Sequence, residues 1–147
     1  MIAIIDYGAG NIHSIEKALE HVGAKVRVTD DPAVVKEAQA VVLPGVGSGG
    51  AAMARLNEQG LPDAIREATY QGKPFLGICL GMQLLADHHE EGETDGLQLF
   101  RGAVRRIPHG PKIPHMGWNQ VRALDPKLPI FADIPQDAYF YFAHSYY

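Results

Sequence analysis

The sequence has little of several features that would assign a protein to a class at once. It has a single cysteine, Cys79, among 147 residues, so it forms no intramolecular disulfide and is not a disulfide-stapled secreted scaffold. No apolar run approaches the roughly 18–20 residues of a membrane-spanning helix. Met1 leads directly into Ile2 without the basic segment that opens a signal peptide. We therefore expect a cytoplasmic protein with a reduced thiol and no membrane contact.

An excess of positive charge is also missing. Lys and Arg total 13 against 17 Asp and Glu, for a formal net charge of −4, which argues against a nucleic-acid partner. One basic group has no aromatic residues interleaved with it, and we interpret it as a solvated face or a contact with a protein partner. Its members are Arg101, Arg105, Arg106 and Lys112.

Short apolar runs alternate with helical spacing over residues 1–87. This alternation predicts an α/β fold with a parallel sheet and helices on both of its faces. The expected strands are 2–5, 25–29, 40–43 and 73–78. The expected helices are 12–22, 32–38, 51–58, 62–70 and 80–87.

The pattern changes after residue 88, where helical periodicity fades and Pro and Gly become frequent. Short strands are expected at 102–107, 118–124 and 138–143, and we interpret them as an antiparallel extension of the same sheet. Six of the twelve aromatic residues lie in the last nine positions. This run is interpreted as a buried strand.

A Gly-x-Cys-x-Gly sequence, Gly77 to Gly81, joins a predicted strand to a predicted helix. This is the arrangement of a nucleophile elbow with Cys in place of Ser. Glycines suit such a turn because side chains there would meet neighbouring backbone. The elbow would raise Cys79 at the carboxyl end of a central strand, where α/β sheets place their ligands. A buried structural cysteine is the alternative.

A glycine-rich loop, Pro44-Gly45-Val46-Gly47-Ser48-Gly49-Gly50, follows the third predicted strand. It lacks the Lys-Ser/Thr ending of a phosphate-binding loop, and it stands after the wrong strand for a dinucleotide fingerprint. Its backbone N–H groups, together with that of Leu80, are candidates for an oxyanion hole. A flexible strand-to-helix turn is the alternative.

These motifs resemble the class I (triad) glutamine amidotransferases. Three further blocks are similar to one branch of that family, the amidotransferase subunits of imidazole glycerol phosphate synthase. They are Asp6-Tyr7-Gly8-Ala9-Gly10-Asn11-Ile12, Pro114-His115-Met116-Gly117-Trp118-Asn119 and Tyr139-Phe140-Tyr141-Phe142-Ala143-His144-Ser145-Tyr146. The resemblance spans the whole chain and implies a flavodoxin-like core.

The resemblance also implies site residues, a reaction and a partner. It implies that a Cys79 thioester hydrolyses glutamine to glutamate and ammonia without a cofactor or metal. The ammonia would pass to a (β/α)8-barrel cyclase that makes imidazole glycerol phosphate and AICAR in histidine biosynthesis, within a heterodimer. The implied oxyanion-hole residues are Gly45, Val46, Gly47 and Leu80. Those implied for glutamine binding are Gln83, Ser145 and Tyr146, and those near the partner interface are His115, Trp118 and Asn119.

The family's His-Pro-Glu motif, which supplies the catalytic base and its orienting carboxylate, is not in the sequence. We therefore expect residues 1–147 to form a single amidotransferase domain that is incomplete at its C-terminus. A catalytically incomplete docking subunit, another class I amidotransferase or another cysteine hydrolase are the alternatives. None of the seven histidines is expected to replace the base. His13 and His21 are interpreted as a solvated helix face, His88 and His89 as acidic solvated surface, His109 and His115 as loop or interface residues, and His144 as the nearest candidate.

Overall fold

The computed structural model describes residues 1–108 and 112–147, and it divides into two compact units, 1–105 and 106–147. Each unit is a separate compact body with its own secondary structure. Within the described ranges, no helix combines the length and the apolar character needed to cross a bilayer.

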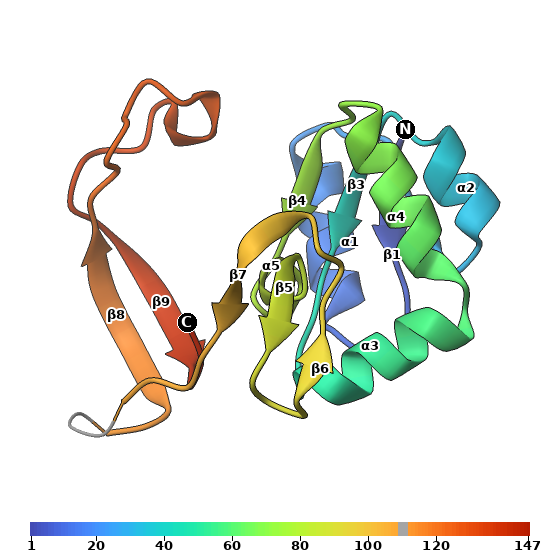
Figure 1. Ribbon diagram of the computed structural model, residues 1–147. Coiled ribbons are helices and arrows are strands. Elements are labelled where there is room, and N and C mark those ends of the chain that lie inside the picture. The colour runs from blue at the N-terminus through green and yellow to red at the C-terminus, as the bar shows by residue number, and fades with distance from the viewer. Residues whose placement is uncertain (109–111) are drawn as a thin grey trace. The chain divides into compact units, whose positions relative to one another are not determined.

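A four-stranded parallel sheet forms the centre of the first unit (Figure 1). Its strands are β1 (Ile2–Ile5), β2 (Val26–Thr29), β3 (Ala40–Leu43) and β4 (Phe75–Gly77), in the order β2-β1-β3-β4. All three neighbouring pairs are parallel. The parallel sheet expected from the sequence is confirmed, and its order is the beginning of the flavodoxin-like order.

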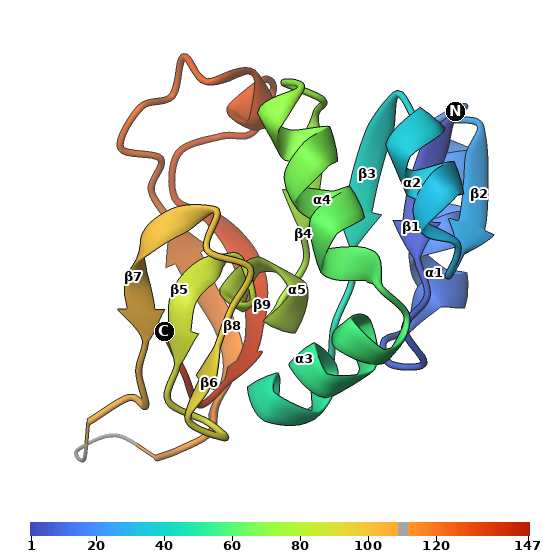
Figure 2. The same cartoon turned by 45° about the vertical axis from the view of Figure 1, so that its right-hand side comes forward.

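Helices cover both faces of this sheet, as expected. α1 (Ile12–His21) lies on one face, while α2 (Pro32–Glu37) and α4 (Leu61–Tyr70) lie on the other (Figures 1 and 2). α3 (Gly49–Glu58) packs beside α4. Two of the helices begin one or two residues earlier than the apolar spacing indicates, because glycine and proline at their starts interrupt the pattern.

Side-chain caps fix where three of these helices begin. The side chains of Asn11, Asp31 and Ser48 accept hydrogen bonds from backbone N–H groups of the first turn at 3.3, 2.8 and 3.4 Å. Each bond satisfies an N–H that has no partner inside its own helix. Ser48 therefore converts the end of the glycine-rich loop into the start of α3.

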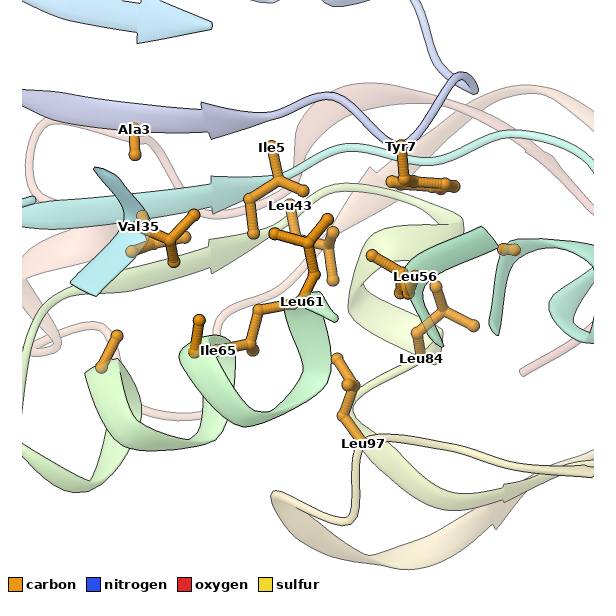
Figure 3. Packing of buried hydrophobic residues seen from close by; sticks show 14 of the residues in the cluster. Ala3, Ile5, Tyr7, Val35, Leu43, Leu56, Leu61, Ile65, Leu84 and Leu97 are labelled. Carbon is orange, nitrogen blue, oxygen red and sulfur yellow. The ribbon is translucent and has the colours of Figure 1, made fainter. Parts of the chain in front are cut away.

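The core lies between the sheet and the helices α2 and α4 that cover one of its faces (Figure 3). Ile5 and Leu43 of the strands and Leu61 and Ile65 of α4 are fully buried there. Burial of each such side chain contributes about 1.5–3 kcal/mol. The core therefore fixes the strand ends from which the candidate site is built.

The helix expected at residues 80–87 is wrong in its second half. α5 covers only Leu80–Gln83, and strand β5 follows at Ala86–His89. The carbonyl oxygens of Leu84 and Leu85 accept hydrogen bonds at 2.7 and 2.8 Å from N–H groups in the segment after the next turn. The helix ends because these carbonyls bond to a distant segment instead of to the following turn.

β5 is the centre of a second small sheet in the first unit. β6 (Thr94–Asp95) pairs with it antiparallel, and β7 (Phe100–Val104) pairs with it parallel. The strand expected at 102–107 therefore begins two residues earlier, and it belongs to this sheet.

The second unit contains one antiparallel pair, β8 (His115–Val121) and β9 (Ala138–His144), and a 3-10 turn, η1 (Pro129–Phe131). Trp118 lies opposite Tyr141 in the register. The antiparallel strands expected here are confirmed, and they pair with each other in a two-stranded sheet.

The aromatic run of β9 is not a buried strand. Tyr139, Phe140 and Tyr141 are exposed, and Phe142 and His144 are only half-buried. A two-stranded sheet has no second layer of its own to cover it, so apolar sequence alone overstates its burial.

Candidate active site

Cys79 occupies a sharp turn between β4 and α5. Its backbone angles are φ 54° and ψ −117°, a left-handed conformation that is rare for a residue with a side chain. Holding such a residue costs about 1–3 kcal/mol, and residues of this kind concentrate at functional sites. Its side chain is exposed. The elbow geometry expected from the sequence is confirmed, and the alternative of a buried structural cysteine is wrong.

Two flanking glycines are required by close backbone approach. A Cβ on Gly81 would lie 1.9 Å from the carbonyl oxygen of Leu43, and one on Gly77 would lie 2.5 Å from Cα of Met82. Neither neighbour is a flexible side-chain end, so no side chain fits at either position. The elbow therefore packs directly on the carboxyl end of β3.

The same close packing joins the glycine-rich loop to the elbow. Gly45 is buried, and a Cβ there would lie 2.7 Å from the backbone nitrogen of Gly81 and 2.9 Å from Cβ of Leu80. Val46 and Gly47 are exposed, and Gly47 has φ +91°. The structure thus brings two sequence-predicted groups together, because loop and elbow are in contact.

The first N–H after the nucleophile differs from those that follow. The N–H of Gly81 donates to Ile78, and those of Met82 and Gln83 donate to Cys79. The N–H of Leu80 has no backbone acceptor among the described residues. A donor of this kind beside a nucleophile suits an oxyanion.

Tyr7 is a site residue that the sequence did not assign. It is fully buried, and its hydroxyl donates to the carbonyl oxygen of Pro44 at 3.0 Å. Burial raises the pKa of Tyr7 to about 12, while the positive charge of Arg55 opposes the rise. The neutral hydroxyl therefore anchors the start of the glycine-rich loop. The position of Tyr7 in the front family block was the only sequence signal for it.

The interpretation of His89 as solvated surface is wrong. His89 is fully buried on β5, where its Nε2 lies 3.2 Å from Oε1 of Gln83. Burial lowers its pKa. The expectation placed both histidines in an acidic patch, but alternate residues of a strand face opposite sides. His88, on the other side, is half-exposed and lies 3.5 Å from Glu93.

The remaining histidines divide between the two units. His13 and His21 are exposed on α1, as expected. His109 lies outside the described residues. In the second unit, Nδ1 of His115 lies 3.1 Å from Nε2 of His144.

The other residues assigned by resemblance all belong to the second unit. The carbonyl of Ser145 accepts from the N–H of Ile107 at 2.9 Å, and the carbonyl of Tyr146 lies 2.8 Å from Nδ1 of His144. These residues form one connected end of the β8–β9 pair. Their roles in glutamine binding remain predictions.

Trp118 and Asn119 are exposed on β8. The ring of Trp118 is 67% exposed and meets Tyr141 edge to face at a centroid distance of 5.6 Å. A large aromatic side chain left in solvent is common at protein interfaces. The four residues of the basic group are exposed as well.

Residues 1–108 and 112–147 bring together no group of three His, Cys, Asp or Glu side chains able to hold a metal ion.

Comparison with known proteins agrees with this geometry. The family model of class-I glutamine amidotransferases matches residues 3–147. Imidazole glycerol phosphate synthase subunit HisH of Moorella thermoacetica is 54% identical over 147 residues, covering 99% of this chain and 70% of the relative. The subunit of the same name from Acinetobacter baylyi is 49% identical over 149 residues, covering 99% and 72%.

A crystal structure described as a glutamine amidotransferase matches this fold with a TM-score of 0.73. The match covers 99% of this chain and 72% of the other at 16% identity, so it supports the fold alone. The sequence matches go further, because they combine identities of 54% and 49% with coverage of nearly every residue of the chain. This chain therefore belongs to the class-I glutamine amidotransferases and, within them, to the HisH subunits of imidazole glycerol phosphate synthase.

Proposed function

We propose that this chain hydrolyses glutamine through Cys79 and supplies the ammonia to a cyclase in histidine biosynthesis. Membership of the HisH family gives the class of activity, a glutaminase subunit of imidazole glycerol phosphate synthase. The observation that supports Cys79 as nucleophile is its place on the elbow, with positive φ and an exposed thiol. It is also the only cysteine of the sequence.

The reaction proceeds in two halves. The Cys79 thiolate forms a bond to the side-chain carboxamide carbon of glutamine, and the carbonyl electrons move to the oxygen. Collapse of this oxyanion breaks the carbon–nitrogen bond, and the protonated nitrogen leaves as ammonia. Water then attacks the thioester and releases glutamate and the thiol. One glutamine and one water thus give one glutamate and one ammonia.

Backbone N–H groups stabilise the oxyanion of each half-reaction. Leu80 provides one donor directly after the nucleophile, and the loop Gly45-Val46-Gly47 provides the other after a change in its peptide orientation. Removal of one such donor typically costs 10²–10³-fold in rate. The contact of Gly45 with the elbow and the positive φ of Gly47 support this assignment.

Gln83, Ser145 and Tyr146 contact the glutamine substrate in this proposal. Gln83 is half-buried at the end of α5, four residues after Cys79. The assignment of Ser145 and Tyr146 rests on the family blocks alone.

The ammonia is consumed by a (β/α)8-barrel cyclase that forms imidazole glycerol phosphate and AICAR, and the two subunits form a heterodimer. His115, Trp118 and Asn119 lie at this interface, an assignment supported by the exposed ring of Trp118. No nucleic acid is a partner, which the net charge of −4 supports.

Residues 1–147 act as one amidotransferase domain, and the chemistry uses no cofactor. The cytoplasm is the proposed location because a nucleophilic cysteine must stay reduced.

Both half-reactions need a group that accepts and returns a proton. In this family the group is the histidine of a His-Pro-Glu motif, and the 147 residues contain no such sequence. The test therefore uses two forms, the chain as it stands and the chain extended by a segment that carries this motif.

The experiment measures glutamate release from glutamine with the cyclase and its nucleotide substrate present. The extended form is expected to release glutamate, and its Cys79→Ala variant is expected to release none above background. Cys79→Ala removes only the sulfur at an exposed position, so the variant is expected to fold and to bind the cyclase like the parent. Both properties are measured as controls. Glutamate release that survives Cys79→Ala contradicts the proposal.

The unextended chain distinguishes a glutaminase from a docking subunit. Binding to the cyclase without glutamate release supports a catalytically incomplete docking role for this form. Turnover of glutamine by the 147 residues alone excludes that role.

A further inference from the structure

The side chain of Tyr7 is in direct contact with the first peptide of the glycine-rich loop. Tyr7 follows β1 by two residues, and its ring is buried in the core. Its hydroxyl donates to the carbonyl oxygen of Pro44 at 3.0 Å. A Cβ on Gly45 would lie 2.7 Å from the same hydroxyl oxygen. Rotation of the Pro44–Gly45 peptide would leave this buried hydroxyl without its acceptor, which is costly.

The hydroxyl of Tyr7 is a donor at every pH below about 10. Burial raises its pKa to about 12, the positive charge of Arg55 opposes the rise and a thiolate at Cys79 adds to it. The hydroxyl therefore lies within electrostatic reach of the nucleophile. The guanidinium of Arg55 also donates to the carbonyl of Gly8, which ties the turn after Tyr7 to α3. The anchor of the loop is thus itself held by a neighbouring helix.

A different set of bonds holds the far end of the loop. The side chain of Ser48 accepts from the first turn of α3 at 3.4 Å. Glu91 accepts twice from the residues that follow, through Oε2 from the N–H of Gly49 at 3.3 Å and through its carbonyl from the N–H of Gly50 at 3.2 Å. The loop is therefore fixed at both of its ends.

Val46 and Gly47 lie between these two anchors. Both residues are exposed, and their N–H groups have no backbone acceptor among the described residues. A cavity of about 140 Å³ lies against them, with Ala9 and Arg55 in its wall. This stretch combines N–H groups free of backbone hydrogen bonds with space in which a peptide can turn.

We infer that Tyr7 is a positioning residue for the oxyanion hole. Its hydroxyl holds the Pro44–Gly45 peptide in place against the elbow. A turn of the loop is thereby confined to Val46 and Gly47, and it brings an N–H of that stretch to one place beside Cys79. The inference rests on the proposed role of this loop as an oxyanion donor. Tyr7 acts through the loop and touches no reacting atom, so its hydroxyl governs the chemical step and not the affinity for glutamine.

The first test compares Tyr7→Phe with the parent in the extended form bound to the cyclase. Phe keeps the ring in the core and removes only the hydroxyl. We expect kcat for glutamate release to fall about 10-fold and KM to change by less than about 2-fold. The loss is smaller than the 10²–10³-fold of a missing donor, because a misplaced donor still contributes. Labelling of Cys79 by iodoacetamide needs only the thiol and is expected to stay unchanged.

Tyr70→Phe is the matched control. It removes the same hydroxyl from the other tyrosine of residues 1–105, which is 79% exposed on α4, and it is expected to leave kcat and KM unchanged. A kcat of Tyr7→Phe equal to that of the parent overturns the inference, and so does a loss that lies entirely in KM. Slower labelling by iodoacetamide overturns it as well, because the change would then have reached the elbow itself.

A second measurement needs no substitution. The hydroxyl proton of Tyr7 in the parent chain is expected to exchange slowly enough to be seen by proton NMR, because it is buried and bonded to Pro44. A hydroxyl proton that exchanges too fast to be seen overturns the inference, even if Tyr7→Phe does not fold. The proposed function fails separately, if the extended form still releases glutamate after Cys79→Ala.

Discussion

The two units of this chain are stabilised in different ways. In residues 1–105, side chains from strands and helices close a core in which Ile5, Leu43 and Ile65 have no exposed surface. In residues 106–108 and 112–147, no residue is buried, and the β8–β9 pair relies on its ladder of hydrogen bonds and on aromatic contacts such as Trp118 with Tyr141. A two-stranded sheet is marginal when nothing covers it. The nucleophile belongs to the unit with the buried core, and the exposed aromatic surface belongs to the unit without one.

The elbow is where close packing should have its largest effect. Gly81→Ala places a methyl group 1.9 Å from the carbonyl oxygen of Leu43, which cannot move without shifting β3. We expect loss of about 4 kcal/mol or more of unfolding free energy, or no folded protein. Denaturant unfolding measures it. Gly47→Ala is the control, because nothing lies within 4 Å there and only its φ of +91° is strained. A Gly81→Ala chain as stable as Gly47→Ala would break the close-packed account.

Matched truncations compare the two units directly. Ile65→Ala leaves a cavity in the core and is expected to cost about 2–5 kcal/mol. Tyr141→Ala removes a side chain that is 55% exposed, and it is expected to cost no more than about 1 kcal/mol. Thermal unfolding followed separately by Trp118 fluorescence and by circular dichroism measures both. Equal losses of unfolding free energy in the two variants would contradict the contrast between a unit with a buried core and a unit without one.

Alkaline pH should lower the stability of residues 1–105 by removing the proton of Tyr7. Because its pKa is about 12 when folded and 10 when unfolded, the folded state holds the proton more tightly. The stability is therefore fully present below pH 10 and is lost as pH rises toward 12, by about 2 kcal/mol. Urea unfolding between pH 9 and 12 measures the loss. The Tyr7→Phe variant should have a lower unfolding free energy at neutral pH, and this free energy should change less between pH 9 and 12. If the variant loses as much stability over this range as the parent, Tyr7 is not the cause of the loss.

The smallest expected effect on stability is at Trp118. Trp118→Ala removes a ring that is 67% exposed, so unfolding free energy should change by less than about 1 kcal/mol. Binding to the cyclase should weaken much more, by about 10-fold or more, if the ring is an interface anchor. Titration with the cyclase measures this, with Tyr70→Ala as a control at an aromatic residue of α4 that is even more exposed, at 79%. Equal effects of the two changes would remove Trp118 from the interface.

The same division explains how much could be predicted from the sequence. β1 to β4 and the helices between them follow from local apolar spacing and caps, and the elbow follows from Gly77, Cys79 and Gly81. These features are set by neighbours in sequence or by the demands of a single turn. The contact of the glycine-rich loop with the elbow follows from their places at neighbouring strand ends.

The predictions that were wrong concern residues whose structure depends on contacts with segments distant in the sequence. Apolar spacing continues through Leu84 and Leu85, yet the helix ends there because residues 97 and 99 take their carbonyls. His89 is surrounded by acidic residues in sequence, yet β5 turns it inward against Gln83. The anchoring of the loop by Tyr7 joins residues 37 positions apart. No local pattern encodes these contacts.

Mass mapping after treatment with a diazoketone analogue of glutamine tests whether Cys79 is the glutamine nucleophile. We expect one adduct per chain, located on Cys79. It should form faster than with a diazoketone that lacks the α-amino and carboxylate groups, and added glutamine should suppress it. An adduct on another residue, or labelling of Cys79 that glutamine does not slow, would contradict it.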